Sequence, residues 1–235
     1  MPILNNEKSK DIEEMLKAGV HYGYSRSSRH PNAKDFIFAI RNNIEIFDLE
    51  KVSQKLGEAK EFIKNLGKEK KKIVFVGTKI EARKSIEDTA KGLGMPYVSQ
   101  RWLGGFLTNF KSMKKRMEYF EDLAKKKETG ELEKYTKKER MLIEKDFQKL
   151  KKFFDSLKSL NGLPQAMVII DPCEERISAE EAKKNSVPVV ALVNSDCNPK
   201  SVDYPVPGND SSSSSIDYFL KEISSAYKEG EKLAI

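Results

Sequence analysis

The chain has 235 residues and a formal net charge of +7. This length suffices to bury a hydrophobic core, and no uninterrupted apolar run is long enough to cross a bilayer. Because no leader pattern follows Met1, we expect a cytoplasmic protein, or one of an organellar matrix. The sign of the charge favours a polyanionic partner.

Short β-rich runs alternate with amphipathic helical patterns, which predicts a parallel sheet covered by helices. In chain order we first expect weak strands at 36–40 and 44–47, a helix at 49–66, a strong strand from Ile73, a helix at 80–93 and a weak strand at 97–98. After residue 160 we expect a strong strand from Met167, a helix at 174–184, a strong strand from Val187, a weak strand at 202–206 and a helix at 215–227. The strong strands are continuously apolar, as in strands buried on both faces.

Residues 110–160 carry a different pattern, in which apolar residues recur every three or four positions in two stretches. The stretches are Phe110, Met113, Met117, Phe120 and Ala124, and then Ile143, Phe147, Leu150, Phe154 and Leu157. Gly130 separates them, and the capping-box sequence Thr136 to Glu139 starts the second helix near Lys137. We therefore predict an antiparallel coiled-coil hairpin with arms of roughly 25–35 Å. It is inserted in a discontinuous α/β domain of residues 1–109 and 161–235.

Most of the net positive charge lies in this predicted hairpin. Residues 111–158 hold 16 Lys and Arg against 10 Asp and Glu. A solvated helix face without a partner is the ordinary explanation of such a run. Its concentration in one protruding element favours contact with phosphates instead. The serine run at 211–215 is expected to be a loop and helix N-cap region.

An enzyme of this architecture would carry its active site at the carboxyl ends of the strands. Gly77, Thr78 and Lys79 suggest a phosphate loop, but the second Gly and the Ser or Thr after the Lys are missing. Asp171 and Asp196 could hold Mg²⁺, yet too few carboxylates are expected to converge there. A phosphate- or nucleotide-handling enzyme using Lys79 and Asp171 remains the alternative.

The remaining reactive side chains also give little support for catalysis. His21 lies in an apolar, glycine-rich run, and no GxSxG nucleophile elbow is present. Cys173 and Cys197 are far apart in the sequence without a CxxC partner, which favours reduced structural thiols over a disulfide or zinc knuckle. We expect no catalytic residue, metal or cofactor.

Three segments together resemble the bacterial-type ribosomal protein S-two family. The first is AGVHYG from Ala18, continuing to Pro31 and FIFAIRNNIEIFDLEKV. The second is VGTK followed by RWLGGFLTNF, and the third runs from GLPQAMVIIDP through PVVALVNSDCNP to VDYPVPGND. They occur in the family's order at compatible spacings, so the resemblance covers residues 15–227.

The resemblance implies a flavodoxin-like parallel sheet with a protruding coiled-coil hairpin. It also implies a non-enzymatic structural constituent of the small ribosomal subunit, bound to ribosomal RNA near the junction of head and body. Its neighbours would be other small-subunit proteins, including in many bacteria ribosomal protein S-one, and it would not be a homo-oligomer. The chain departs from the family pattern at residues 24–30, where a second His is usual, and in the serine run.

The candidate RNA contacts are the basic residues of the family-like segments and the hairpin, although ordinary surface charge accounts for some of them. They are Arg26, Arg29, Arg41, Lys79, Arg101, Lys111, Lys114, Lys115 and Arg116. Recognition through backbone and shape is expected, because no aromatic pair predicts base stacking. A free regulatory protein that binds a messenger RNA is a further alternative.

The segment RWLGGFLTNF is predicted to be the junction between sheet and hairpin. Gly104 and Gly105 would supply backbone freedom for a tight passage, and Thr108 or Asn109 would cap the first helix. Trp102 is the only Trp, and we expect it to anchor the core at the hairpin's base rather than to stack on a base.

Overall fold

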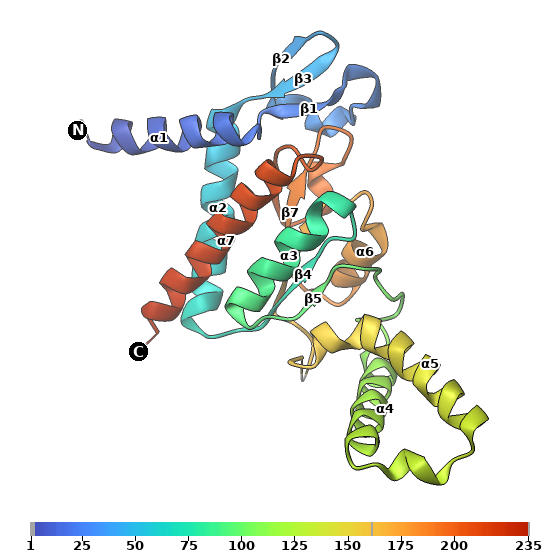
Figure 1. The fold of residues 1–235 in the computed structure, drawn as a ribbon. Coiled ribbons are helices and arrows are strands. Elements are labelled where there is room, and N and C mark those ends of the chain that lie inside the picture. Colours follow the sequence, from blue (N-terminus) through green and yellow to red (C-terminus); the bar gives the residue numbers. More distant parts are fainter. Residues whose placement is uncertain (1–2, 161, 235) are drawn as a thin grey trace.

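A five-stranded parallel sheet forms the centre of the computed structural model, which describes residues 3–160 and 162–234 (Figure 1). Its strands are β4 (Ile73–Val76), β5 (Tyr97–Val98), β6 (Ala166–Ile170), β7 (Val189–Val193) and β8 (Tyr204–Pro207). Their spatial order is β5-β4-β6-β7-β8, which is the flavodoxin-like order. The predicted α/β fold is therefore confirmed, while the expected boundary residue 161 lies outside the described residues.

Helices cover both faces of this sheet. The helices α2 (Leu49–Lys68), α3 (Ile80–Leu93) and α7 (Ser213–Lys232) pack on one face, and α6 (Arg176–Lys184) packs on the other. Successive strand residues point to opposite faces, so Ile73 and Phe75 enter the first core, whereas Val74 and Val76 enter the second. The strong strands are apolar throughout because both of their faces are buried.

The two weak strands near the N-terminus belong to a separate antiparallel sheet. It consists of β1 (Tyr22–Ser25), β2 (Ile37–Arg41) and β3 (Ile44–Phe47) in the order β1-β3-β2. Asn42 and Asn43 have φ angles of 51° and 65°, the left-handed conformation that a tight hairpin turn requires. The sequence did not predict this second sheet or β1.

The helix α1 (Ile3–Ala18) was also not predicted. Among residues 10–18 only Met15 is buried, so the helix lacks the broad apolar stripe by which helices are recognised. Short 3-10 turns occur at η1 (Arg26–Ser28), η2 (Pro31–Phe36), η3 (Glu131–Lys134), η4 (Asp155–Leu157) and η5 (Pro199–Ser201). None of the helices in the described part of the chain combines the length and apolarity required to span a membrane.

Residues 110–160 form the two expected helices, α4 (Phe110–Glu128) and α5 (Lys137–Phe154). The predicted capping box is confirmed, since Thr136 accepts a hydrogen bond from the Glu139 amide and the Glu139 carboxylate accepts one from the Thr136 amide. Figure 1 shows the helices diverging from each other as they leave the sheet. Their rings of Phe120 and Phe147 lie 5.4 Å apart, but Met141 is 53% exposed. The two helices and the turn that joins them form a helical hairpin, whereas the predicted coiled coil is not confirmed.

Gly230 in α7 packs directly against the backbone of α2. A Cβ at Gly230 would collide with the backbone carbonyl of Lys64. We expect Gly230→Ala to destabilise the protein by about 1–3 kcal/mol, because overpacking forces the two helices apart. Urea unfolding measures the effect.

The matched control is Gly92→Ala in α3, where an added Cβ meets nothing within 4 Å. Alanine is the better helix former, so this variant should gain about 0.5–1 kcal/mol. Equal unfolding midpoints for the two variants would contradict the inferred helix contact.

Candidate nucleic-acid interface

Lys79 lies in a buried ion-pair cluster at the carboxyl ends of the parallel strands. Its Nζ is 2.5 Å from Asp171 Oδ2 and 2.6 Å from Asp210 Oδ2, and both carboxylates are almost fully buried. Burial acts to lower the pKa of Lys79, but the hydrogen bonds and charges of the two aspartates outweigh it and raise that pKa. Lys79 is thus a fixed cation whose charge is already balanced.

The N-terminal sheet covers this end of the parallel strands. The Tyr24 amide donates to Ser195 Oγ at 3.0 Å, and the His30 amide donates to the Ser195 carbonyl at 2.8 Å. Nearby, Arg29 forms an ion pair of 3.2 Å with the fully buried Glu45. The place where a flavodoxin-like enzyme would bind its ligand is therefore occupied by the protein's own side chains and backbone.

The two departures from the family pattern meet at this cluster. Tyr24 stands where the resemblance would place a second His, and Ser211 begins the serine run. The hydroxyl groups of Tyr24 and Ser211 lie 2.8 Å apart, and Lys79 Nζ is 3.4 Å from the Tyr24 hydroxyl. The serine run is also shorter as a loop than expected, because α7 begins at Ser213.

Glu181 on α6 organises the junction between the sheet and the hairpin. Its buried carboxylate accepts hydrogen bonds from the amides of Gly105 at 2.5 Å and Leu107 at 2.9 Å. It also accepts from the Thr108 amide at 3.3 Å and from Trp102 Nε1 at 3.4 Å. A single carboxylate thus satisfies the backbone donors of the tight passage.

The predicted junction residues lie at the start of the hairpin. Trp102 is 6% exposed and contacts the ring of Phe106, in the core that α4 and α5 share with the sheet. Gly105 has a φ of +85°, which favours glycine. Asn109 occupies the N-cap position of α4, but its side chain makes no capping hydrogen bond. The backbone donors of this segment are satisfied by Glu181 instead.

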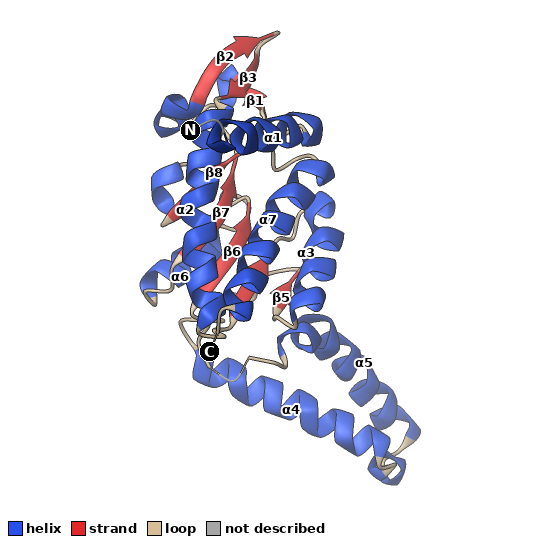
Figure 2. Ribbon diagram, turned by 90° about the vertical axis from the view of Figure 1, so that its left-hand side faces the viewer, coloured by secondary structure: helices blue, strands red, loops and turns tan. Residues whose placement is uncertain are grey.

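The structure divides the predicted RNA contacts into two groups. Arg26, Arg29 and Arg41 belong to the N-terminal sheet region, and Lys79 lies beside it. Arg101, Lys111, Lys114, Lys115 and Arg116 belong to the junction and α4. Figures 1 and 2 place the N-terminal sheet and the hairpin at opposite ends of the molecule. All nine are exposed except Arg29 and Lys79, which are partly buried in their ion pairs.

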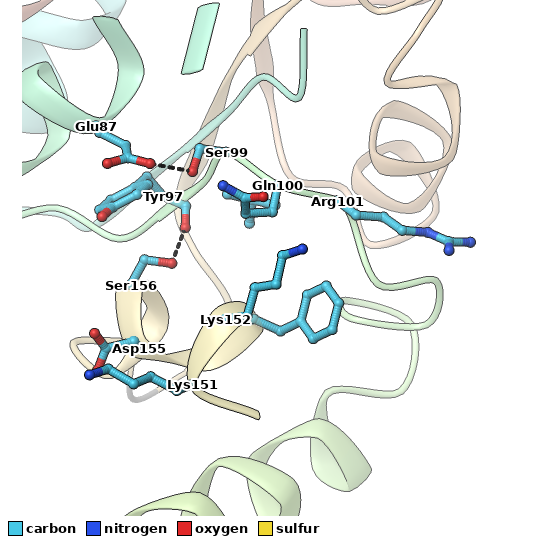
Figure 3. A pocket seen from close by; sticks show the side chains of 11 residues that line it. Glu87, Tyr97, Ser99, Gln100, Arg101, Lys151, Lys152, Asp155 and Ser156 are labelled. Carbon is cyan, nitrogen blue, oxygen red and sulfur yellow. Dashed lines mark hydrogen bonds between the residues drawn. The ribbon is translucent and has the colours of Figure 1, made fainter. Parts of the chain in front are cut away.

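A cavity of about 260 Å³ lies where the hairpin's base meets the strand β5. Arg101, Lys151 and Lys152 supply its basic side chains, and Figure 3 shows Lys152 directed toward the segment that carries Gln100. Its acidic residues are already engaged with other lysines, because Glu87 pairs with Lys91 and Asp155 with Lys158. Figure 3 also shows the Arg101 side chain extending away from the cavity, so Lys152 is directed into the cavity while Arg101 is exposed beside it.

Hydrogen bonds hold the carboxylate of Glu87 in the wall of this cavity. Burial acts to raise the pKa of its carboxyl group, but hydrogen bonds from Ser99 and Lys91 outweigh burial and lower that pKa. Figure 3 shows the Ser99 hydroxyl beside the Glu87 carboxylate, and the Ser156 hydroxyl donating to the Tyr97 carbonyl. These bonds fix the cavity's wall to the edge of the sheet.

Comparison with known proteins identifies the family. The family model described as Ribosomal protein S2 matches residues 15–230. The chain belongs to the ribosomal protein S2 family. A relative from Dictyoglomus thermophilum, named Small ribosomal subunit protein uS2, is 42% identical over 94% of this chain and 90% of its own length. A relative of the same name from Dictyoglomus turgidum is 41% identical over 94% of this chain and 90% of its own length. Another from Nitratiruptor sp. is 40% identical over 94% of this chain and 83% of its own length.

Membership in the ribosomal protein S2 family confirms the resemblance read from the sequence motifs and the expectation that the chain is not an enzyme. The members compared are proteins of the small ribosomal subunit. The alternative enzyme would use Lys79 and Asp171, which in the structure bind each other. Proteins of this family are constituents of the translation machinery.

Sequence reasoning missed Glu181, Lys151 and Lys152 as candidate site residues. Glu181 looked like an ordinary charge on an amphipathic helix, and only the fold brings it under the junction. Lys151 and Lys152 were part of the counted basic surplus, and their adjacency gave the one available signal. No pattern within the sequence related them to Arg101.

Loss of the Glu181 carboxylate should destabilise the junction. Glu181→Leu would leave several backbone donors buried without a partner, so we expect a loss on the order of 3 kcal/mol or more. Urea unfolding followed by the fluorescence of Trp102 measures it. The neighbouring exposed Glu180 is the control, and Glu180→Gln should change stability by only about 0.5 kcal/mol. A Glu181 variant as stable as this control would refute the role.

The positive φ of Gly105 gives a second prediction for the junction. Valine is strained in this conformation, so Gly105→Val should misplace the hairpin and lower the share of the protein that sediments with small subunits. Gly104→Val is the matched control, because a Cβ there meets nothing within 4 Å and its φ is not positive. Equal incorporation of the two variants would count against a positioning role for Gly105.

Proposed function

We propose that this protein is held in the small ribosomal subunit by binding ribosomal RNA through the base of its hairpin, and that it performs no turnover. The observation that carries the proposal is the group of exposed basic side chains at the hairpin's base, where Lys152 is directed into the cavity and Arg101 lies beside it. The exposed residues Lys111, Lys114, Lys115 and Arg116 extend the positive surface along α4. Membership in the family indicates which particle contains the protein, and the cavity is the place where we propose that a phosphate group binds.

The mode of binding should be recognition of the backbone. Arginine and lysine grip phosphate oxygens, and such contacts position a protein without reading bases. The side chain of Trp102 is buried and therefore unavailable for stacking on a base. Binding should accordingly weaken steeply as salt rises.

The exposed Arg26 and Arg41 offer a second point of attachment at the opposite end of the molecule. Two separated basic surfaces suit a protein that bridges RNA elements, and we include in the proposal the location near the junction of head and body. Docking of ribosomal protein S-one and a ribosome-bound place in the cytoplasm are likewise proposed from the family. An RNA contact at Lys79 stays a prediction, because the Lys79 side chain would have to break its ion pairs with Asp171 and Asp210 to reach RNA.

Sedimentation of a lysate at moderate salt tests the assignment. We expect the protein in the small-subunit fraction, and release from it as salt increases. A protein found free of that fraction would overturn the proposal, and selective recovery with a messenger RNA would favour a free regulator instead. Crosslinking from Arg101 and Lys152 would then identify the RNA contacted.

Reversal of charge at the cavity tests the surface itself. Arg101→Glu combined with Lys152→Glu should weaken binding to small-subunit RNA and reduce the salt slope by about 0.7–0.9 for each lost phosphate contact. The control is Lys221→Glu on the exposed face of α7, which changes charge away from the hairpin. An unchanged salt slope in the double variant would exclude the cavity as a contact.

A further inference from the structure

Two cysteines and an aspartate converge beside the Lys79 cluster. Among the described residues, one oxygen of Asp171 and the sulfur atoms of Cys173 and Cys197 all lie within 4.8 Å of one another. The thiol of Cys197 donates to Asp171 Oδ1 at 3.3 Å. These atoms come from the turns that follow β6 and β7, which are adjacent parallel strands.

The surrounding contacts hold the three groups in place. The Cys173 amide donates to Asp171 Oδ1 at 2.9 Å, and the Cys197 amide donates to the Asn194 carbonyl at 3.2 Å. Lys79 binds the other oxygen, Asp171 Oδ2, so Oδ1 is turned toward the thiols. This is how an outer partner orients a metal ligand.

We propose that Asp171, Cys173 and Cys197 form a binding site for a thiophilic divalent cation of the zinc type, with water as the fourth ligand. Zn–S bonds of about 2.3 Å in a tetrahedron separate two sulfur ligands by about 3.8 Å, which lies inside the observed limit. Side-chain adjustments of less than about 1 Å would complete the geometry. Sulfur ligands select zinc over magnesium or calcium.

The local charge also favours a cation. Asp171, Asp196 and Asp210 bring three carboxylates against the single ammonium group of Lys79. One oxygen of Asp196 is buried and has no hydrogen-bond partner among the residues that the structure describes. A divalent ion would offset the excess of negative charge.

An entry path exists for the ion. A cavity of about 440 Å³ is lined by Pro172, Cys173 and Asn198, and Cys173 is exposed in it. Cys197 lies buried behind Cys173.

Metal titration of the purified full-length chain in reducing buffer tests the site. We expect a single equivalent of Co²⁺ to give tetrahedral visible bands with sulfur-to-metal charge transfer, and Zn²⁺ to displace it. Cys173→Ser should weaken Zn²⁺ binding by at least about tenfold, since even outer partners have effects of this size. Because Cys173 is exposed, this variant should fold, and the fluorescence of Trp102 checks that it does.

The control is Glu174→Gln, which removes the adjacent exposed carboxylate outside the ligand set. It should bind Zn²⁺ as the unaltered chain does. Absence of charge transfer, or equal Zn²⁺ affinity in Cys173→Ser and the unaltered chain, would overturn the proposal. So would a disulfide between Cys173 and Cys197 in protein alkylated directly on release from cells.

Discussion

The ion pairs of Lys79 with Asp171 and Asp210 are the constraint on which the rest of the sheet domain depends. They join residues that follow β4, β6 and β8, so the ends of three strands share one buried charge cluster. Breaking a buried pair is costly because it leaves an uncompensated charge, on the order of 3–5 kcal/mol. The cluster therefore serves the architecture, in the place where a related fold would hold a ligand.

Several other features follow from this cluster. The hydroxyl groups of Tyr24 and Ser211 contact each other, and that of Tyr24 also lies beside the Lys79 ammonium group. Lys79 binds one oxygen of Asp171, and the other oxygen accepts hydrogen bonds from the amides of Cys173 and Glu174 and from the Cys197 thiol. A structural ion pair and the proposed cation site thus use opposite sides of one side chain.

The hairpin is governed by a different carboxylate, that of Glu181. The chain must turn sharply between β5 and α4, and a buried turn leaves amide groups without partners. Glu181 satisfies them from the neighbouring helix α6, so the hairpin's base is fixed to the sheet. The basic cavity of Arg101 and Lys152 lies on that fixed base rather than on the free ends of the helices. Such a fixed base would suit the proposed phosphate site.

The sequence by itself determined the α/β class, the strong strands, the start of α5 at its capping box and the family, because these depend on local periodicity and on motifs of adjacent residues. Only the tertiary structure decided that the weak strands at 36–40 and 44–47 form a second sheet, that Glu181 lies under the junction and that Cys173 lies beside Cys197. The cysteines are distant in sequence but follow neighbouring parallel strands. Contacts of this kind arise from the order of strands in space, and no local pattern encodes that order.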